Sequence, residues 1–184
     1  MSRLILLGIG AADSSRFAPV GLLLEYGHAR VGVDGGPGSE PPENIDAWLV
    51  RDESGPLQSE LRRIAGETGM PAPAVMPYHH GPLEVEPVPI AGRPYGYRIR
   101  VGHHVAGWLP EAPQLPGWAE GLDLVFADGS LDGPHIQELA RTAKRLRVQR
   151  LVFVRLGAAA LTAVDAGERP PYGEWGEEGR TYRM

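Results

Sequence analysis

The sequence predicts an α+β protein in which two β-sheets pack face to face and helices cover their outer faces. Two observations support this prediction. The chain opens with short apolar strands joined by tight turns, and it later has a strand, a helix and a strand at 123–127, 134–146 and 150–154. This order disfavours a doubly wound parallel sheet, because such a sheet alternates strand and helix from its start.

The composition indicates one globular domain with many turns. The 184 residues suit a single domain, 42% of them are apolar, and 25 glycines and 18 prolines favour short elements over long helices. The sequence has no cysteine, which excludes disulfides and thiolate metal ligands. A transition metal would therefore need histidine and carboxylate ligands.

Charge and hydropathy limit the expected partners. The net charge is −5 and the basic residues are scattered, so the sequence shows no nucleic-acid-binding footprint. No apolar run reaches the length of a bilayer span, and the run near the N-terminus is too short for a signal peptide. We expect a cytoplasmic protein with neither a nucleic-acid nor a membrane partner.

The first part of the chain predicts four strands, two of which form a hairpin, and a helix. The turn Tyr26-Gly27-His28 separates two apolar runs, which is a hairpin signal, and glycines in 34–38 end the second run. Leu57, Leu61 and Ile64 lie at helical spacing before Gly69. The expected elements are strands at 4–7, 20–25, 29–33 and 47–50 and an amphipathic helix at 57–68.

The second part predicts further strands and the best helix. Residues 75–101 are predicted to form β-strands. Within them, aromatic or aliphatic residues alternate with glycine or arginine over 95–101, which is the pattern of a strand. The helix at 134–146 has its apolar residues at helical spacing: Ile136, Leu139, Ala140, Ala143 and Leu146. Residues 167–184 are rich in glycine, proline and charge, and we expect an irregular surface tail there. The predicted domain spans residues 1–166.

Several segments resemble metallo-β-lactamase-fold hydrolases. Residues 6–8, 21–27 and 33–38 resemble the start of that family, whose first hairpin ends in an aspartate–glycine turn that supports the metal site. Residues 99–108 resemble the strand that delivers a metal-binding histidine, and His103 stands in that place. The resemblance implies a shortened four-layer αββα sandwich of the metallo-β-lactamase type.

A later segment is similar to one branch of this family. Residues 123–130 resemble a strand of the tRNA 3′-end processing endonucleases and of the metallo-β-lactamase-like protein of pyrroloquinoline-quinone biosynthesis. That strand closes with an acidic residue, here Asp128. In the endonucleases the carboxylate partners a histidine just before the next helix, and His135 stands there.

The sequence departs from the family at most of the metal ligands. Where the family carries His-x-His-x-Asp-His after its fourth strand, this chain has Arg51-Asp52-Glu53-Ser54-Gly55-Pro56. Where the family usually has a histidine after its last strand, this chain has Arg155. The segment with the aspartate that bridges two metals looks deleted between Trp108 and Leu122. The resemblance therefore implies a degenerate metal site, and we expect 51–56 to bind no metal.

Three residues remain as candidates for chemistry. Asp128 and His135 could form a catalytic pair, because a carboxylate can orient a histidine that acts as a general acid or base. The alternative is structural: Asp128 caps a turn and His135 begins the helix. His103 is the candidate metal ligand. Arg155 should point into the former metal cleft and meet an acid, for which the candidates are Asp34, Asp52, Glu53 and Asp128.

Three functions stay open on this sequence. The first is a non-catalytic protein that binds an unknown small molecule or a partner, with no cofactor. The second is a phosphoester-type hydrolase that uses His103, Asp128 and His135 with at most one metal, a single zinc. The third is an accessory subunit that dimerises with an active relative, and a homodimer is a further alternative.

Overall fold

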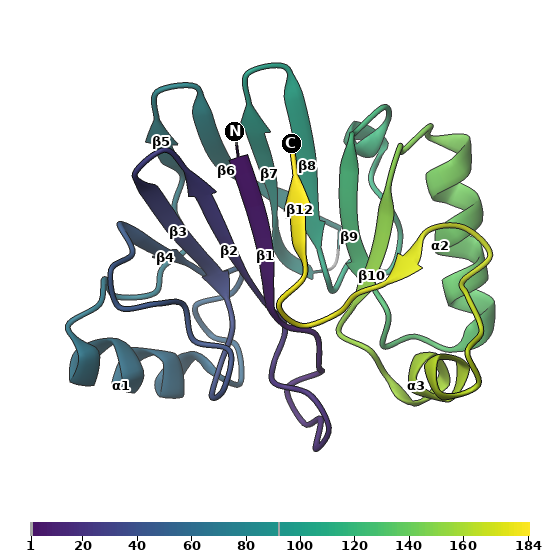
Figure 1. The fold of residues 1–184 in the computed structure, drawn as a ribbon, viewed down its shortest axis with the longest axis horizontal. Coiled ribbons are helices and arrows are strands. Elements are labelled where there is room, and N and C mark those ends of the chain that lie inside the picture. Colours follow the sequence, from purple (N-terminus) through teal and green to yellow (C-terminus); the bar gives the residue numbers. More distant parts are fainter. Residues whose placement is uncertain (1, 92) are drawn as a thin grey trace.

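The structure is a computed structural model that describes residues 2–91 and 93–184. The described residues form a five-stranded and a seven-stranded β-sheet (Figure 1). The first sheet has the order β12 (Thr181–Arg183), β1 (Ser2–Gly8), β2 (Gly21–Tyr26), β3 (Ala29–Asp34) and β4 (Ala47–Leu49). The second has the order β11 (Glu174–Trp175), β10 (Leu151–Val154), β9 (Leu124–Asp128), β8 (His104–Leu109), β7 (Arg93–Val101), β6 (Leu83–Ile90) and β5 (Tyr78–His80).

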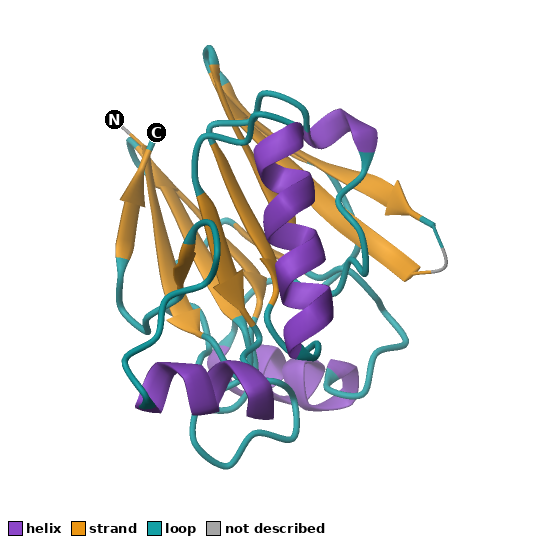
Figure 2. Cartoon of the chain, turned by 90° about the vertical axis from the view of Figure 1, so that its right-hand side faces the viewer, coloured by secondary structure: helices purple, strands orange, loops and turns teal. Residues whose placement is uncertain are grey.

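Helices cover the outer faces of both sheets, which confirms the predicted layers (Figures 1 and 2). The helix α1 (Gln58–Thr68) packs Leu61 and Ile64 against Leu23 and Trp48 of the first sheet. The helices α2 (Gly133–Arg145) and α3 (Ala158–Asp165) cover the second sheet, and a short 3-10 helix spans Gly117–Ala119. None of the helices in the described ranges is long and apolar enough to cross a membrane.

The main core lies between the two sheets and continues under α2. Leu4, Leu6, Leu22 and Leu24 of the first sheet are fully buried, as is Phe126 of the second sheet. Alternation along β1 and β2 places these side chains on the inner face. The four-layer arrangement therefore follows from apolar residues on both faces of each sheet.

Strand direction brings five loops to one end of the sandwich. β3 and β4 run parallel, and so do β8, β9 and β10. The carboxyl ends of parallel strands meet at one edge of a sheet, and ligand sites often form there. The loop after Val50 follows β4, the edge strand of its sheet.

The C-terminal residues 167–184 are not the irregular surface tail that the sequence predicted. β12 pairs antiparallel with β1, with Leu4 opposite Tyr182, and the Tyr182 side chain is almost fully buried. β11 pairs parallel with β10. These strands have only two and three residues, so they show no alternation in the sequence. Pairing with β1 and β10 stabilises them, which intrinsic propensity does not reveal.

Candidate functional site

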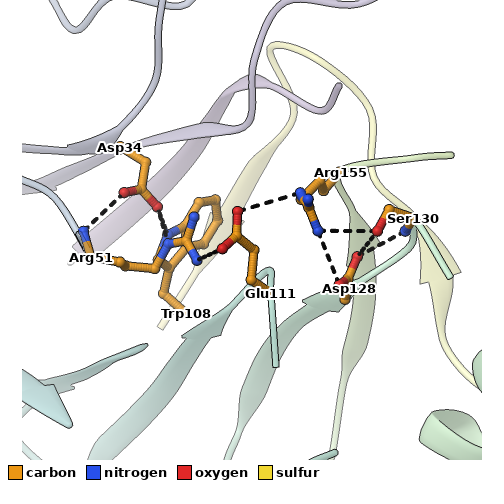
Figure 3. Close-up of polar contacts among 7 residues, drawn as sticks. All are labelled: Asp34, Arg51, Trp108, Glu111, Asp128, Ser130 and Arg155. Atoms are coloured by element: carbon orange, nitrogen blue, oxygen red, sulfur yellow. Dashed lines mark hydrogen bonds and ion pairs between the residues drawn. The ribbon is translucent and has the colours of Figure 1, made fainter. Parts of the chain in front are cut away.

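A continuous chain of ion pairs occupies the strand ends (Figure 3). Its five charged residues alternate in sign in the order Asp34, Arg51, Glu111, Arg155 and Asp128. They come from the ends of β3, β4, β8, β10 and β9 or from the residues that follow. The chain therefore crosses from the first sheet to the second.

Asp34 anchors the first end of this chain. The indole Nε1 of Trp108 donates a hydrogen bond of 2.7 Å to Oδ2 of Asp34, and the Arg51 backbone N–H donates one of 3.2 Å to Oδ1. The Arg51 Nε also donates to Oδ2. The backbone carbonyl of Asp34 accepts from the indole of Trp48 at 2.8 Å. Trp108 and Asp34 thus tie the two sheets together at the site.

Arg51 lies deep in the structure, with 10% of its side chain exposed. Its Nη1 is 3.4 Å from Oε2 of Glu111. Burial alone would lower the pKa of the Arg51 guanidinium, but its pairing with Asp34 and Glu111 outweighs this and raises the pKa. The preceding carbonyl, of Val50, accepts a 2.9 Å hydrogen bond from the hydroxyl of Tyr97. Backbone and side chain together hold the guanidinium in place.

Arg155 meets Asp128 at the other end, as the sequence predicted. Its Nη1 donates to Oδ2 of Asp128 at 3.2 Å and to Oγ of Ser130 at 3.1 Å. The backbone N–H and the hydroxyl of Ser130 both donate to Oδ1 of Asp128, at 2.8 and 2.7 Å. Burial raises the pKa of Asp128, although the hydrogen bonds from Ser130 and the charge of Arg155 act in the opposite direction.

Two members of the network have strained backbones. Among the described residues, three non-glycine residues have a positive φ, namely Asp34 at 55°, Arg147 at 56° and Arg155 at 57°. Such conformations cost about 1–3 kcal/mol each and concentrate at functional sites. Asp34 and Arg155 are both in the network, so the fold holds these two side chains at a cost.

Glu111 connects the two arginines, and sequence reasoning missed it. The residue follows β8, in the stretch between Trp108 and Leu122 where a segment of the family looks deleted. No sequence pattern marks this glutamate as part of a site. Its Oε1 is 3.5 Å from Nε of Arg155, and 29% of its side chain is exposed. Only the packing of the two sheets brings it between Arg51 and Arg155. No signal in the sequence could have found this contact.

A pocket opens beside the network and encloses about 100 Å³. Five charged side chains line it, those of Asp34, Arg51, Asp52, Glu111 and Arg155. Apolar side chains line it as well, among them Val20, Pro56, Leu57 and Leu61. Charged and apolar groups in one pocket suit a small molecule with one polar end.

The predicted pair of Asp128 and His135 does not form. Nδ1 of His135 lies 2.6 Å from Oδ1 of Asp132, and 61% of the histidine side chain is exposed. Asp132 is the N-cap of α2 and also accepts the backbone N–H of His135 at 3.1 Å. The prediction was wrong because this nearer acid captures the histidine, while Ser130 and Arg155 surround Asp128. His135 begins the helix, as the structural alternative stated.

His103 lies at the other end of the sheet. It is exposed in the turn between β7 and β8, where Gly102 has a φ of 61°. In the parallel register Leu109 lies opposite Ala127, so Asp128 is beyond the far end of β8. The structure therefore separates His103 from Asp128 and from the pocket. The predicted reduced site of three residues is not assembled.

The residues at the strand ends do not fit a zinc centre. Zinc needs neutral imidazoles or carboxylates that converge on the ion. Within residues 2–91 and 93–184, no group of three or more histidine, aspartate and glutamate side chains is arranged to hold a metal ion. Of the carboxylates that line the pocket, those of Asp34 and Glu111 pair with guanidinium groups, and that of Asp52 accepts hydrogen bonds from Ser54.

The fold is similar to solved metallo-β-lactamase-fold structures, although no family model and no curated protein matches the sequence. The metallo-β-lactamase fold protein YhfI from Bacillus subtilis has a TM-score of 0.70 and 16% identity, over 98% of both chains. A diphosphatase of the PhnP family has 0.68 and 16%, over 100% of this chain and 98% of its own. Zinc-bound PqqB from Methylobacterium extorquens has 0.64 and 12%, over 99% of this chain and 100% of its own. The four-layer architecture and these likenesses together show that this chain has the metallo-β-lactamase fold.

Proposed function

We propose that this protein binds a small molecule without a metal ion, in the pocket beside Arg51 and Arg155, and does not act as a metallohydrolase. One observation carries the proposal. Two guanidinium groups follow β4 and β10, the positions at which the resemblance places metal-binding histidines, and both line the pocket. A degenerate metal site and a retained scaffold fit this role.

Electrostatics supports the loss of the metal centre. A guanidinium remains charged at all physiological pH values. A divalent cation 4 Å from such a group is opposed by roughly 8 kcal/mol at an effective dielectric constant of 20. Asp34 and Asp128, which could offset this repulsion, are each hydrogen-bonded to an arginine. A metal ion would have to compete for carboxylates that are already paired.

The shape of the pocket supports a binding role. A void of about 100 Å³ that is lined by charged and apolar side chains admits part of a small molecule. The strained conformations of Asp34 and Arg155 hold charged side chains at its edge, and such strain is typical of ligand sites. The arrangement offers recognition by charge and shape. Among the described residues that line the pocket there is no histidine for general acid–base chemistry.

Two measurements on one preparation test the proposal. Protein purified without added metal is analysed for zinc, iron and manganese by mass spectrometry, and then assayed with bis(p-nitrophenyl) phosphate with and without added zinc. We expect far less than one metal ion per chain and no hydrolysis. A stoichiometric metal together with metal-dependent turnover contradicts the proposal.

The binding role has its own readout. Thermal denaturation against a panel of small metabolites should identify compounds that raise the melting temperature of the protein. The same compounds should not raise that of Arg155→Met. Equal shifts in both proteins place the binding elsewhere and contradict the role of this pocket.

A further inference from the structure

We infer that the pocket recognises the carboxylate or phosphate group of its ligand, and that Glu111 occupies the position of that group when the ligand is absent. This inference rests on the proposed function and specifies its ligand class. The ligand's oxyanion would exchange with the Glu111 carboxylate between Arg51 and Arg155, while the rest of the ligand would contact the apolar side chains that line the pocket.

Glu111 is held much less tightly than the other two carboxylates of the network. Its contacts to Arg51 and Arg155 are 3.4 and 3.5 Å, longer than the 2.7–2.9 Å of a charge-assisted hydrogen bond. Its side chain is 29% exposed, against 12% for Asp34 and 4% for Asp128. Asp34 and Asp128 also accept hydrogen bonds from Trp108 and Ser130. Glu111 is therefore the carboxylate that can leave.

The two guanidinium groups have donors to spare. A guanidinium carries five N–H donors, which match a carboxylate or a phosphate in a two-bond arrangement. The hydrogen bonds recorded for the described residues use Nε of Arg51 and Nη1 of Arg155. Each oxygen of Glu111 faces a different guanidinium, which is how a bound oxyanion would bridge them. Figure 3 shows the Glu111 carboxylate between the two arginines.

The start of α1 also favours an anion in the pocket. The residues Gly55, Pro56, Leu57 and Gln58 lead into α1 and line the pocket. In the described part of the chain no side chain caps the N-terminus of this helix of 11 residues. The N-terminal end of a helix carries a partial positive charge, which favours an anion nearby. This contribution adds to that of the two arginines.

The charge count requires exchange instead of simple addition. Asp34 and Asp128 already balance the two arginines, and Glu111 and Asp52 add two further negative charges. A second anion beside Glu111 would suffer like-charge repulsion in a partly buried site. If Glu111 turns out to solvent, the incoming anion takes over its contacts with no net change of charge. Glu111 should therefore compete with the ligand and weaken its binding.

The experiment measures binding of three probes by calorimetry at constant ionic strength. The probes are inorganic phosphate, succinate and, as a cation, methylammonium. The proteins are the wild type, Glu111→Gln, Arg155→Met and Arg155→Lys. Glu84→Gln is the matched control, because Glu84 is a partly exposed acid that pairs with Arg100 on another part of the second sheet.

We expect Glu111→Gln to bind phosphate or succinate at least tenfold more tightly than the wild type and Glu84→Gln to behave as the wild type. Arg155→Met should lose this binding, and Arg155→Lys should retain part of it because a lysine keeps the charge without the planar fork. Tighter binding of phosphate than of succinate, or the reverse, identifies whether the pocket recognises a phosphate or a carboxylate group. Far-UV circular dichroism verifies that each variant is folded.

Unchanged or weaker anion binding in Glu111→Gln overturns the inference, as does tighter binding of methylammonium by the wild type than by Glu111→Gln. The metal analysis of the same preparation separates the two proposals. A metal-free protein that binds no anion refutes only the ligand class, whereas a stoichiometric metal with turnover refutes the proposed function itself.

Discussion

Arg155 donates a hydrogen bond of 3.2 Å to Asp128, and this contact joins the ends of two neighbouring parallel strands. Val154 lies opposite Asp128 in the β9–β10 register, so Arg155 is the first residue beyond the pair. Its positive φ turns the chain there. The register and the turn together aim the guanidinium at a buried carboxylate. The same geometry extends through Glu111 to Arg51.

Arg51→Met should destabilise the protein strongly. The substitution leaves Asp34 as a buried carboxylate without its cation, and breaking a buried pair in this way costs about 3–5 kcal/mol. Chemical denaturation measures the change in the free energy of unfolding. Arg63→Met is the control, because Arg63 pairs with Glu60 and Glu67 on an exposed helix face and should show no resolvable change. Equal effects would show that the pair of Arg51 and Asp34 does not stabilise the fold.

Asp128→Asn should change how stability depends on pH. Burial raises the pKa of Asp128 above its usual 3.8, so the folded state binds the proton more tightly than the unfolded state. Its contribution to stability is fully present below the unfolded pKa and is lost as pH rises through the folded pKa. The stability of the wild type relative to Asp128→Asn should therefore fall from pH 4 upward, by at most about 1.4 kcal/mol per pH unit.

Asp132→Asn should change the pH dependence of stability in the opposite direction. The hydrogen bond from the backbone of His135 lowers the pKa of Asp132 below its usual value. Its contribution is present above the unfolded pKa and is lost as pH falls through the folded pKa. Denaturation curves between pH 3 and 7 compare both variants with the wild type. Slopes of the same sign for the two aspartates would contradict the assigned environments.

Tyr182→Ala should lower the free energy of unfolding by about 3–5 kcal/mol. The ring of Tyr182 is almost fully buried and packs edge-to-face with that of Phe126, with 5.2 Å between the ring centroids. Tyr182→Phe should be neutral or stabilising. The buried hydroxyl has no hydrogen-bond partner among the described residues, and an unsatisfied group costs about 1–3 kcal/mol. Tyr95→Ala, at an exposed position, is the control. A mild effect of Tyr182→Ala would mean that β12 is not part of the core.

Trp108→Phe should reduce stability by about 2 kcal/mol. It removes the 2.7 Å hydrogen bond from Nε1 to the Asp34 carboxylate, and bonds to charged groups contribute about 1.5–3 kcal/mol. Trp118→Phe makes the same change in ring size at an indole whose buried Nε1 has no partner in the described structure. Equilibrium unfolding in urea should give a much lower free energy of unfolding for Trp108→Phe than for Trp118→Phe. The reverse order would show that the hydrogen bond from Trp108 to Asp34 does not stabilise the fold.

Local pattern was enough to predict most of the fold. The helix expected at 134–146 is α2 at Gly133–Arg145, and the strand expected at 123–127 is β9 at Leu124–Asp128. The apolar residues in both segments are closely and regularly spaced, so the local sequence alone is enough to predict these two elements. The glycine turn after Asp34 also marked the end of β3. The terminal strands β11 and β12 were missed because each exists only through its partner strand.

The sequence by itself predicted the two sheets with outer helices. The resemblance also implied that Arg155 stands where the family usually has a histidine. The sequence also predicted that Arg155 would meet an acid, because a buried guanidinium without a partner is costly. Only the tertiary structure decided which acids take part. Asp132 outcompetes Asp128 for His135 because it lies three residues away on the same helix start. Glu111 reaches both arginines because the sheets pack together, and no local pattern encodes a contact between residues 60 positions apart in the chain.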